Sequence, residues 1–288
     1  MEINGKTRLC GLIGNPVEHT LSPLIHNTLA EKMGNNLVYL PFPVEEKHLE
    51  DAVAGAFGLN ALGLNVTVPY KSAVMPYLTE IDKLADEIGA VNTLVRSEEG
   101  YAGFNTDMPG LFRAMQSDGV KIDGESVIIL GAGGAARAVA FLCASKGAKE
   151  IFLLNRSIEK ANEVAAEVNA LYGDKVCAME LNRFRELPKW RYLAIQCTSV
   201  GLYPNADAAV IEDEAFYEMI HTGYDLIYRP EETRFMKLVK KAGGAAYNGL
   251  KMLLYQGIIA YELWNGVAVS EEAASEILDL LKEKVSVS

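Results

Sequence analysis

The most constraining feature of this sequence is a glycine-rich turn between an apolar segment and a helical segment. Four apolar residues at 127–130 predict a buried strand, and residues 137–146 continue with the period of a helix. Between them lies the spacing G-x-G-x-x-A, formed by Gly131, Gly133 and Ala136. A strand, a glycine turn and a helix in this order are typical of a dinucleotide-binding unit.

In such a unit each small residue has its own task. Gly131 permits the tight turn, Gly133 lets the backbone approach a pyrophosphate, and Ala136 lets the helix pack on the strand. The phosphates are expected at the free N–H groups and the positive dipole end of the helix. Tight turns between a strand and a helix also need glycine when no ligand is bound, so the turn alone does not establish a cofactor site.

The strand that follows indicates which dinucleotide is bound. Residues 150–155 predict a buried strand that ends in Asn155, followed by Arg156 and Ser157. NAD-binding units usually have an acidic residue near this point for the ribose 2′-hydroxyl, whereas a guanidinium pairs with a 2′-phosphate. The sequence therefore predicts NADP(H) as the cofactor. The alternative is that Arg156 is an ordinary solvated charge before the next helix.

Length, charge and cysteine content exclude several classes of protein. The chain has 288 residues, which is enough for two modest domains. Its net charge of −11 argues against broad binding of nucleic acid or of anionic membranes. The four cysteines are scattered, so we expect neither a disulfide framework nor a metal site.

The sequence also bears on location and partners. No apolar run approaches the length of a membrane span, and the first residues lack the basic and then apolar order of a signal peptide. We therefore expect a cytoplasmic protein that acts on a small molecule. The sequence does not distinguish a monomer from a homodimer.

Strands alternate with helices along most of the chain, which predicts an α/β fold with parallel sheets and helices on their faces. We expect a helix that has Ser22 as its N-cap and Pro23 at its first position. Residues 73–87 predict a helix with one break. A long apolar helix at 250–264 and an amphipathic helix at 270–285 end the chain.

Polar clusters lie at the ends of the predicted strands and helices, where α/β proteins build their sites. Thr20 and Ser22 place two hydroxyls at a helix N-terminus, which suits a carboxylate ligand, although a plain helix cap would also explain Ser22. Asn65 and Thr67 lie on one face of a strand, and Lys71 follows that strand. Lys71 is a candidate general acid or base, although a lysine after a strand is more often a surface residue.

Two more polar residues stand in unusual places. Asn92 and Asp107 lie between apolar or glycine-rich segments, where an amide and a carboxylate are not expected. Turn formation explains part of this, because Asn and Asp favour turns. The polar clusters together are stronger evidence for a functional site than any one of them is alone.

Together the clusters resemble the shikimate dehydrogenase family, the NADP-dependent enzymes of the aromatic amino acid pathway. The resemblance extends from Gly14 to Trp264 and rests on H-[ST]-x-S-P-x-x-H-N, N-V-T-V-P-[FY]-K, G-A-V-N-T, G-x-N-T-D, G-A-G-G-A-[AS]-R, N-R-[ST] and G-x-x-M-L-x-x-Q. The blocks N-V-T-V-P-[FY]-K and G-x-N-T-D are specific, whereas many dehydrogenases share the glycine turn.

The resemblance implies two domains. Residues 1–108 with 248–288 would form an α/β domain that binds the substrate and to which the C-terminal helices return, and residues 109–247 would form a Rossmann-type, doubly wound NADP-binding domain. The implied substrate-binding residues are Thr20, Ser22, Asn65, Thr67, Lys71, Asn92, Asp107, Tyr228 and Gln256. The implied cofactor-binding residues are Gly131, Ala132, Gly133, Gly134, Ala135, Asn155, Arg156, Ser157, Lys160, Thr198, Leu226 and Gly249.

The resemblance also implies the reaction, which is the reversible reduction of 3-dehydroshikimate to shikimate by NADPH on the route to chorismate. Hydride would move from the nicotinamide to the ring carbonyl carbon, and Lys71 and Asp107 would be the catalytic pair. Protonated Lys71 would stabilise the developing oxyanion and supply the proton, while Asp107 would orient the ammonium group. No metal is implied.

Three stretches depart from the family pattern. Thr20 stands where serine is common, and Gln196 with Cys197 replaces a frequent Asn-Ala pair. Lys251 stands where glycine is frequent. We expect Lys251 to add bulk and positive charge near the nicotinamide.

Three alternatives remain open. A quinate/shikimate dehydrogenase of broader specificity has the same chemistry, but Arg156 without a following aspartate favours NADP. A dehydrogenase of the methylenetetrahydrofolate type also has a lysine in its cleft, but the hydroxyls of Thr20 and Ser22 argue against it. A non-catalytic, NADP-sensing regulator on the same fold would not need both Lys71 and Asp107.

Overall fold

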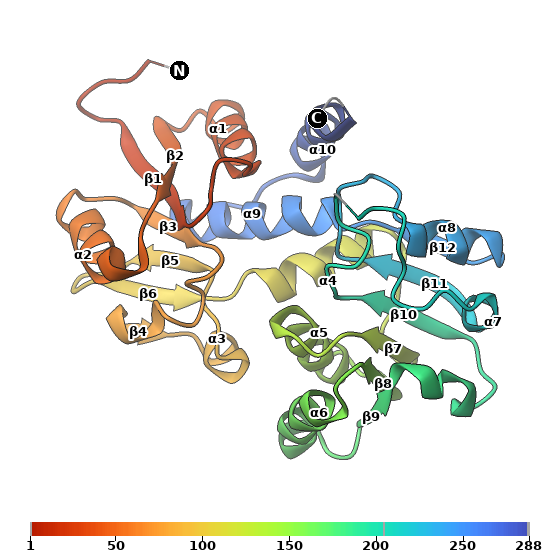
Figure 1. The fold of residues 1–288 in the computed structure, drawn as a ribbon. Coiled ribbons are helices and arrows are strands. Elements are labelled where there is room, and N and C mark those ends of the chain that lie inside the picture. Colours follow the sequence, from red (N-terminus) through yellow and green to blue (C-terminus); the bar gives the residue numbers. More distant parts are fainter. Residues whose placement is uncertain (1, 204, 287–288) are drawn as a thin grey trace. The chain divides into compact units, whose positions relative to one another are not determined.

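The computed structural model describes residues 2–203 and 205–286, and its contacts divide the chain into two compact units (Figure 1). The first unit comprises Met1–Leu111 and Leu253–Lys284, and the second comprises Phe112–Met252 and Val285–Ser288. The chain passes from one unit to the other within three helices, α4 (Asp107–Ser117), α9 (Leu250–Asn265) and, near its end, α10 (Glu271–Ser286). Each unit contains one sheet with helices, so the expected two-domain α/β fold is confirmed.

The second unit is built on a parallel sheet with the strand order β12-β11-β10-β7-β8-β9. Its strands are β7 (Ser126–Leu130), β8 (Glu150–Asn155), β9 (Val176–Glu180), β10 (Tyr192–Gln196), β11 (Ile220–Asp225) and β12 (Ala245–Tyr247). Its helices are α5 (Gly134–Ser145), α6 (Ile158–Tyr172), η3 (Leu181–Glu186), α7 (Glu214–Tyr217) and α8 (Arg234–Lys241). This is the doubly wound order of dinucleotide-binding folds, and it confirms the expected Rossmann-type architecture. The order reverses between β7 and β10, so the loops after these two strands lie side by side.

The first unit contains a mixed sheet with the order β2-β1-β3-β5-β6-β4. Its strands are β1 (Arg8–Gly14), β2 (Leu37–Pro43), β3 (Gly63–Val66), β4 (Glu80–Ile81), β5 (Thr93–Arg96) and β6 (Tyr101–Phe104). Its other helices are α1 (Ser22–Lys32), η1 (Glu46–His48), α2 (Leu49–Gly58), η2 (Met75–Tyr77), α3 (Lys83–Ile88) and α10 (Glu271–Ser286). Strand β5 runs antiparallel to both neighbours, so the expectation of parallel sheets throughout is wrong. The tight turn between β5 and β6 accounts for the antiparallel pairing of these two strands, because a short turn can join only antiparallel strands.

The prediction of one interrupted helix over residues 73–87 is also wrong. The structure has a short helix η2, then the strand β4, and only then the helix α3. Strand β4 pairs with β6, which satisfies its backbone groups outside a helix. A new helix begins after it because the side chain of Asp82 accepts a hydrogen bond from the backbone N–H of Leu84.

The start of α1 differs from the expectation as well. Leu21 occupies the N-cap position, so Ser22 is the first helical residue and Pro23 the second. Ser22 does not cap the helix, because its Oγ instead receives a hydrogen bond from the hydroxyl of Thr20 at 3.2 Å. The two hydroxyls therefore lie together at the helix N-terminus.

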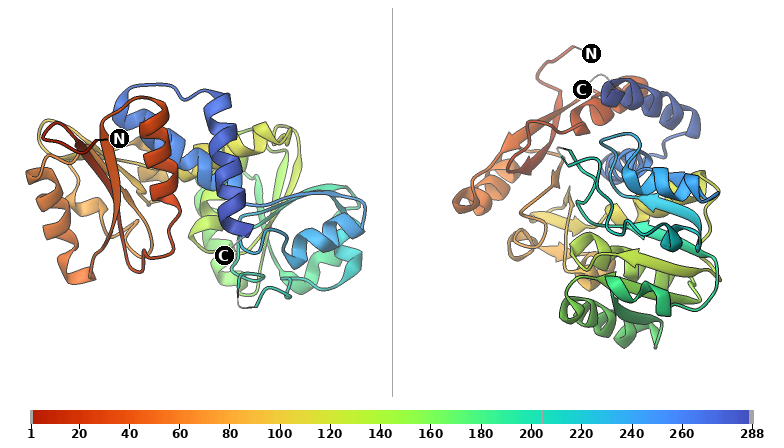
Figure 2. Two further views of the ribbon diagram at one scale, coloured as in Figure 1. Left: turned by 90° about the horizontal axis from the view of Figure 1, so that it is seen from above. Right: turned by 45° about the vertical axis from the view of Figure 1, so that its right-hand side comes forward.

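The C-terminal helices return to the first unit. In α9, Nε1 of Trp264 donates a hydrogen bond to the backbone oxygen of Leu94 in β5 at 2.9 Å. Gly63 permits this approach, since a Cβ atom there would overlap the indole. Helix α10 lies beside α1, where Lys32 forms an ion pair with Glu276 (Figure 2). These contacts fix both helices to the sheet that carries the polar clusters.

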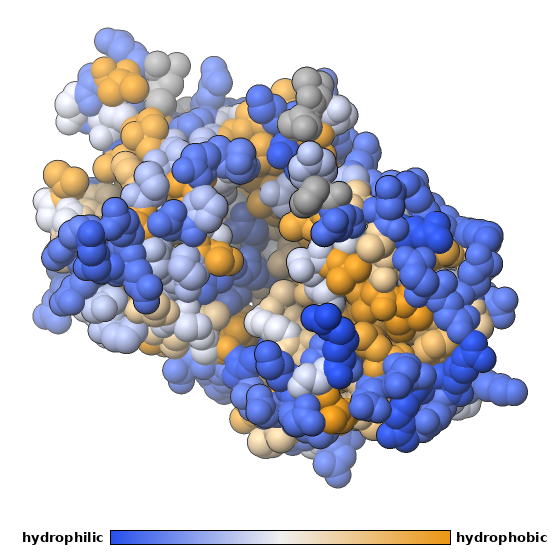
Figure 3. All heavy atoms as spheres, in the orientation of Figure 1, coloured by the Kyte–Doolittle hydropathy of each residue, from blue (hydrophilic) through white to orange (hydrophobic). Residues whose placement is uncertain are grey.

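Hydrophilic side chains cover most of the face shown in Figure 3, and smaller hydrophobic areas lie between them. Within residues 2–203 and 205–286, no helix has the length and apolar character needed to cross a membrane. Cys10 and Cys143 are buried, and burial raises the pKa of each thiol to about 12, so both are structural core residues.

Candidate functional site

An ion pair joins the segment after β3 to the start of α4. Nζ of Lys71 lies 2.6 Å from Oδ2 of Asp107, and these side chains are 33% and 21% exposed. The side chain of Asn105 holds the start of α4, because its Oδ1 accepts hydrogen bonds from the backbone N–H groups of Asp107 and Met108. The structure thus brings together a cation and an anion that remain open to a ligand.

A buried network of amides and hydroxyls lies in the same unit. Nδ2 of Asn65 donates to the backbone oxygen of Asn92 at 3.2 Å and to Oγ1 of Thr93 at 3.1 Å. Oδ1 of Asn92 accepts from the backbone N–H of Thr106 at 2.7 Å, and its Nδ2 donates to Oγ1 of Thr106 at 3.0 Å. The network therefore connects β3, β5 and the residue before Asp107, and it fixes the two amides relative to the ion pair.

Tyr39 was not expected at this site, but it contacts two of the expected residues. Its hydroxyl donates to Oδ1 of Asn65 at 2.8 Å. Burial raises the pKa of Tyr39, and a hydrogen bond with Ser22 opposes that shift. The Tyr39 hydroxyl therefore links the Thr20–Ser22 pair to the amide network. Tyr39 stands in an apolar strand, so only a structure reveals this role.

The imidazole ring of His26 packs against the ring of Tyr39. The imidazole is fully buried and stacks on the ring of Tyr39, with 4.2 Å between centroids and 14° between planes. Its other aromatic neighbours are Tyr261 and Trp264. Neither ring nitrogen has a hydrogen-bond partner in the part of the chain that the structure describes, and burial lowers the pKa of His26 to about 3. His26 is therefore a neutral packing residue and not an acid catalyst.

Helix α9 places Gln256 against α4. A Cβ atom on Gly110 would lie 2.7 to 2.8 Å from the backbone and Cβ of Gln256, so glycine is required for the two helices to touch. Gly110 is one turn after Asp107. Two expected substrate residues lie outside this network. Thr67 is half-buried just after β3, and Tyr228 follows β11 in the second unit.

In the second unit, the glycine turn has the geometry of an anion-binding helix start. Gly131 has φ +112°, which a residue with a side chain would adopt only with strain. Gly133 is the N-cap of α5, and a Cβ atom on Gly133 or Gly134 would meet no atom within 4 Å. Ala136 is fully buried against the core, as expected. The start of α5 is thus exposed and has open space beside both glycines, as phosphate binding at a helix N-terminus requires.

The segment after β8 carries positive charge next to this turn. Arg156 is exposed and has no hydrogen bond or ion pair among the residues that the structure describes. Nδ2 of Asn155 donates to the backbone oxygen of Ser157 at 2.9 Å, and Oγ of Ser157 caps α6 by accepting from the backbone N–H of Lys160. The residues present therefore fit a dinucleotide with a phosphate on its ribose.

The loop after β10 is held by a buried carboxylate. Asp225 is fully buried and accepts hydrogen bonds from Thr233 at 2.6 Å and from Gln196 at 3.3 Å, and burial raises its pKa to about 6. Gln196 also donates to the backbone oxygens of Thr198 and Val200. Thr198 lies next to Gly131, where a Cβ atom would be 2.9 Å from its Cγ2. Gln196 thus shapes the loop that carries Thr198.

The other two expected nicotinamide contacts also lie together. A Cβ atom on Gly249 would overlap the backbone oxygen of Leu226, so only glycine permits their approach. Lys251 forms an ion pair with Asp118, a residue that also accepts a hydrogen bond from the Tyr224 hydroxyl. The charge of Lys251 is therefore balanced by Asp118 within the second unit, and its effect on the nicotinamide pocket stays a prediction.

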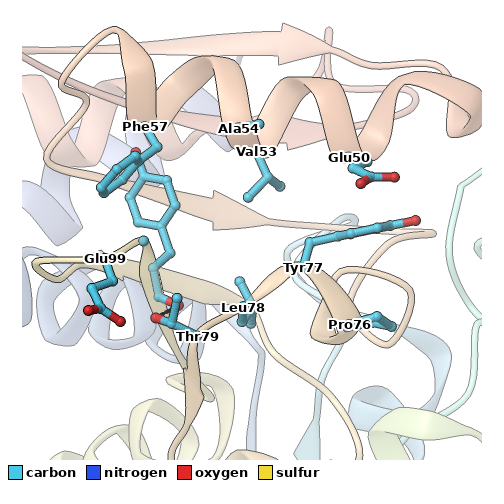
Figure 4. A pocket seen from close by; sticks show the side chains of 11 residues that line it. Glu50, Val53, Ala54, Phe57, Pro76, Tyr77, Leu78, Thr79 and Glu99 are labelled. Atoms are coloured by element: carbon cyan, nitrogen blue, oxygen red, sulfur yellow. Dashed lines mark hydrogen bonds between the residues drawn. The ribbon is translucent and has the colours of Figure 1, made fainter.

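A separate groove of about 430 Å³ lies on the first unit, between α2 and the loops around β4 and β6 (Figure 4). Its charged lining residues are Glu50 and Glu99, and its floor includes Val53, Phe57 and Tyr101. Two carboxylates do not suit an anionic ligand. None of the expected site residues lines this groove. Among the described residues, no group of three His, Cys, Asp or Glu side chains is placed to hold a metal ion.

These features define the class of protein. A doubly wound unit with a glycine turn and a free arginine, together with a second α/β unit that holds a lysine–aspartate pair, is typical of a nicotinamide-dependent oxidoreductase.

Comparisons with known proteins specify the family. Residues 12–94 match the model for the shikimate dehydrogenase substrate binding domain, residues 113–201 that for shikimate/quinate 5-dehydrogenase, and residues 249–277 that for the shikimate 5′-dehydrogenase C-terminal domain. The chain belongs to the shikimate dehydrogenase family.

Individual relatives match over nearly their whole length. The shikimate dehydrogenase (NADP(+)) of Methanopyrus kandleri is 43% identical, with 96% of each chain covered. A crystal structure of a shikimate dehydrogenase in complex with NADP+ has a TM-score of 0.89 at 38% identity and covers 99% of this chain and 98% of its own. The shikimate 5-dehydrogenase of Listeria monocytogenes, in complex with shikimate and NAD, has a TM-score of 0.89 at 32% identity, with 96% of this chain and 98% of that chain covered.

Proposed function

We propose that this chain catalyses the reversible reduction of 3-dehydroshikimate to shikimate with NADPH. The observation that carries this proposal is the Lys71–Asp107 ion pair, which lies beside an ordered amide network in the unit that contains the substrate-binding match. Residues 1–108 with 248–288 would bind the substrate, and residues 109–247 would bind NADP(H).

The chemistry requires a proton at the oxygen of the ring carbonyl as that oxygen becomes an alkoxide. Protonated Lys71 donates this proton in the reduction and accepts it again in the reverse reaction. Asp107 orients the ammonium group by its hydrogen bond at 2.6 Å, and Asn105 fixes Asp107 through the start of α4. The positive charge of Lys71 also stabilises the developing oxyanion.

The remaining first-unit residues recognise the substrate. The hydroxyls of Thr20 and Ser22, at the positive end of α1, bind the substrate carboxylate. The ring hydroxyls are bound by Asn65, Thr67, Asn92 and Gln256, and Tyr228 is a further substrate-binding residue. Most of the hydrogen-bonding capacity of Asn65 and Asn92 is already used inside the protein, so their orientation is set before the substrate arrives.

The second unit holds the cofactor. The residues from Gly131 to Ala135 bind the pyrophosphate at the start of α5, and Asn155, Arg156, Ser157 and Lys160 bind the 2′-phosphate. Thr198, Leu226 and Gly249 line the nicotinamide end. Bound NADPH supplies the hydride for the reaction.

Product analysis with labelled cofactor tests the proposal. Protein incubated with 3-dehydroshikimate and NADPH that carries deuterium at the transferred position should give shikimate with one deuterium on the carbon that was the carbonyl. Proton NMR detects this as the loss of one ring signal. A folded protein that binds NADPH and yields no shikimate would refute the proposal and support a regulatory role.

The contact between Tyr39 and Asn65 gives a prediction about substrate affinity. Tyr39→Phe removes the donor to the buried Oδ1 of Asn65 but keeps the ring that stacks on His26. A buried acceptor without its partner costs about 1–3 kcal/mol, so the amide loses its fixed orientation. We expect the KM for shikimate to rise by roughly tenfold, with a smaller change in kcat. Steady-state kinetics with varied shikimate measures both.

Tyr261→Phe is the matched control, because it removes a hydroxyl from the same aromatic cluster and that hydroxyl contacts Asn35 rather than Asn65. Its KM should stay close to the wild-type value. Equal KM values in the Tyr39→Phe variant and the wild type would show that Tyr39 does not position Asn65 for the substrate.

A further inference from the structure

The first turn of α6 contains a negatively charged side chain, the carboxylate of Glu159. The carboxylate of Glu159 accepts a hydrogen bond from Oγ of Ser157 at 2.8 Å. The nearby backbone N–H of Glu159 and the hydroxyl of Ser157 together lower the pKa of the Glu159 carboxyl, so the group is a carboxylate at neutral pH. A carboxylate in the first turn also interacts favourably with the positive end of the helix.

This arrangement conflicts with the demands of a phosphate. A phosphate bound at the Asn155–Lys160 segment accepts hydrogen bonds, and Ser157 can contribute one only through its single hydroxyl proton. A serine hydroxyl has one proton, and here that proton is given to Glu159. Arg156 and Lys160 form no ion pair with Glu159 among the described residues, so both cations remain available while the hydroxyl does not.

The two cofactors make different demands on Glu159. A 2′-phosphate repels the carboxylate and must displace it from Ser157. A ribose 2′-hydroxyl carries no charge and can donate to a carboxylate, as it does in NAD-binding units. We propose that Glu159 is a specificity-determining residue that competes with the 2′-phosphate of NADP(H) for the Ser157 hydroxyl and so limits the preference for NADP(H) over NAD(H). This inference rests on the proposed assignment of residues 155–160 to the 2′-phosphate.

The variant Glu159→Gln tests the inference as a gain of affinity, which a loss of folding cannot imitate. Glutamine keeps the size of the side chain but removes the negative charge that repels the phosphate, and its neutral amide oxygen is a weaker acceptor for the Ser157 hydroxyl than a carboxylate is. Titration calorimetry at fixed ionic strength should show NADP+ binding about three- to tenfold tighter than in the wild type. The affinity for NAD+ should be unchanged within about twofold, or weaker.

Glu163→Gln is the matched control, since Glu163 is an exposed carboxylate in the next turn of α6 with no hydrogen bond or ion pair among the described residues. It removes the same charge without touching Ser157, so its NADP+ affinity should match the wild type. Equal gains in both variants, or no gain in Glu159→Gln, would overturn the inference.

An Arg156→Ala variant in the same titrations separates this inference from the proposed function. Weaker NADP+ binding in Arg156→Ala together with no gain in Glu159→Gln would reject only the role of Glu159. Unchanged NADP+ binding in Arg156→Ala would reject the 2′-phosphate site itself, and with it both proposals for this segment.

Discussion

Replacement of Lys71 by alanine is expected to lower kcat for shikimate oxidation by about 10²–10⁴-fold, while KM changes far less. The reason is that, among the expected site residues, Lys71 is the one whose ammonium group donates a hydrogen bond to Asp107, at 2.6 Å. Without it, no group in the described ion pair delivers or removes the proton at the alcohol oxygen. Steady-state kinetics with saturating NADP+ and varied shikimate separates kcat from KM.

Lys83→Ala is a suitable control, because Lys83 is an almost fully exposed lysine in the same unit, and its one ion pair among the described residues is with Glu87 at 3.7 Å. Its kinetics should match the wild type, and both variants should bind NADP+ normally. A higher KM with intact kcat in Lys71→Ala would make Lys71 a binding residue, and the acid–base assignment would then have to be given up.

The second large effect concerns the cofactor. Arg156→Ala should weaken the binding of NADP(H) by roughly ten- to a hundredfold and leave NAD(H) unchanged, because only NADP(H) carries the 2′-phosphate that the guanidinium neutralises. The arginine is exposed and has no partner among the described residues, so its removal leaves no buried charge unpaired. Titration of each variant with NADP+ and with NAD+ gives the two dissociation constants.

Arg183→Ala provides the comparison for a simple loss of surface charge. Arg183 is also an exposed arginine of the second unit. It pairs with Glu186, and both residues lie outside the proposed cofactor segment 155–160 in the sequence. Its affinities for both cofactors should equal those of the wild type. If Arg156→Ala lost NADP+ and NAD+ affinity equally, the assignment of Arg156 to the 2′-phosphate would be wrong.

The fold could be predicted where its signals are local. The buried strand β7 and the glycine turn after it are encoded by adjacent residues, and they specify the Rossmann-type unit. The edge strands β9 and β12 are not indicated by the sequence, because they are short and their residues are mostly half-exposed. Strand β4 was missed for a related reason, since its two residues gain their structure only by pairing with β6.

The site could be predicted as a set of residues but not as a set of contacts. Asn92 and Asp107 stand out within motifs, and their neighbours Thr93 and Thr106, which complete the hydrogen-bond network, carry the same signal. Tyr39 gives no such signal, because a tyrosine in an apolar strand is ordinary core. Partnerships such as Gln196 with Asp225 or Lys251 with Asp118 join residues distant in sequence, so only the fold reveals them.

The most direct test of the central claim is the initial rate of nicotinamide reduction by the purified protein, measured spectrophotometrically with shikimate or quinate and with NADP+ or NAD+. We expect rapid turnover with shikimate and NADP+ and kcat/KM values at least tenfold lower for the other three pairs. Comparable rates with quinate or NAD+ would indicate a dehydrogenase of broader specificity. The absence of turnover with every pair, in folded protein that binds NADP+, would contradict the account.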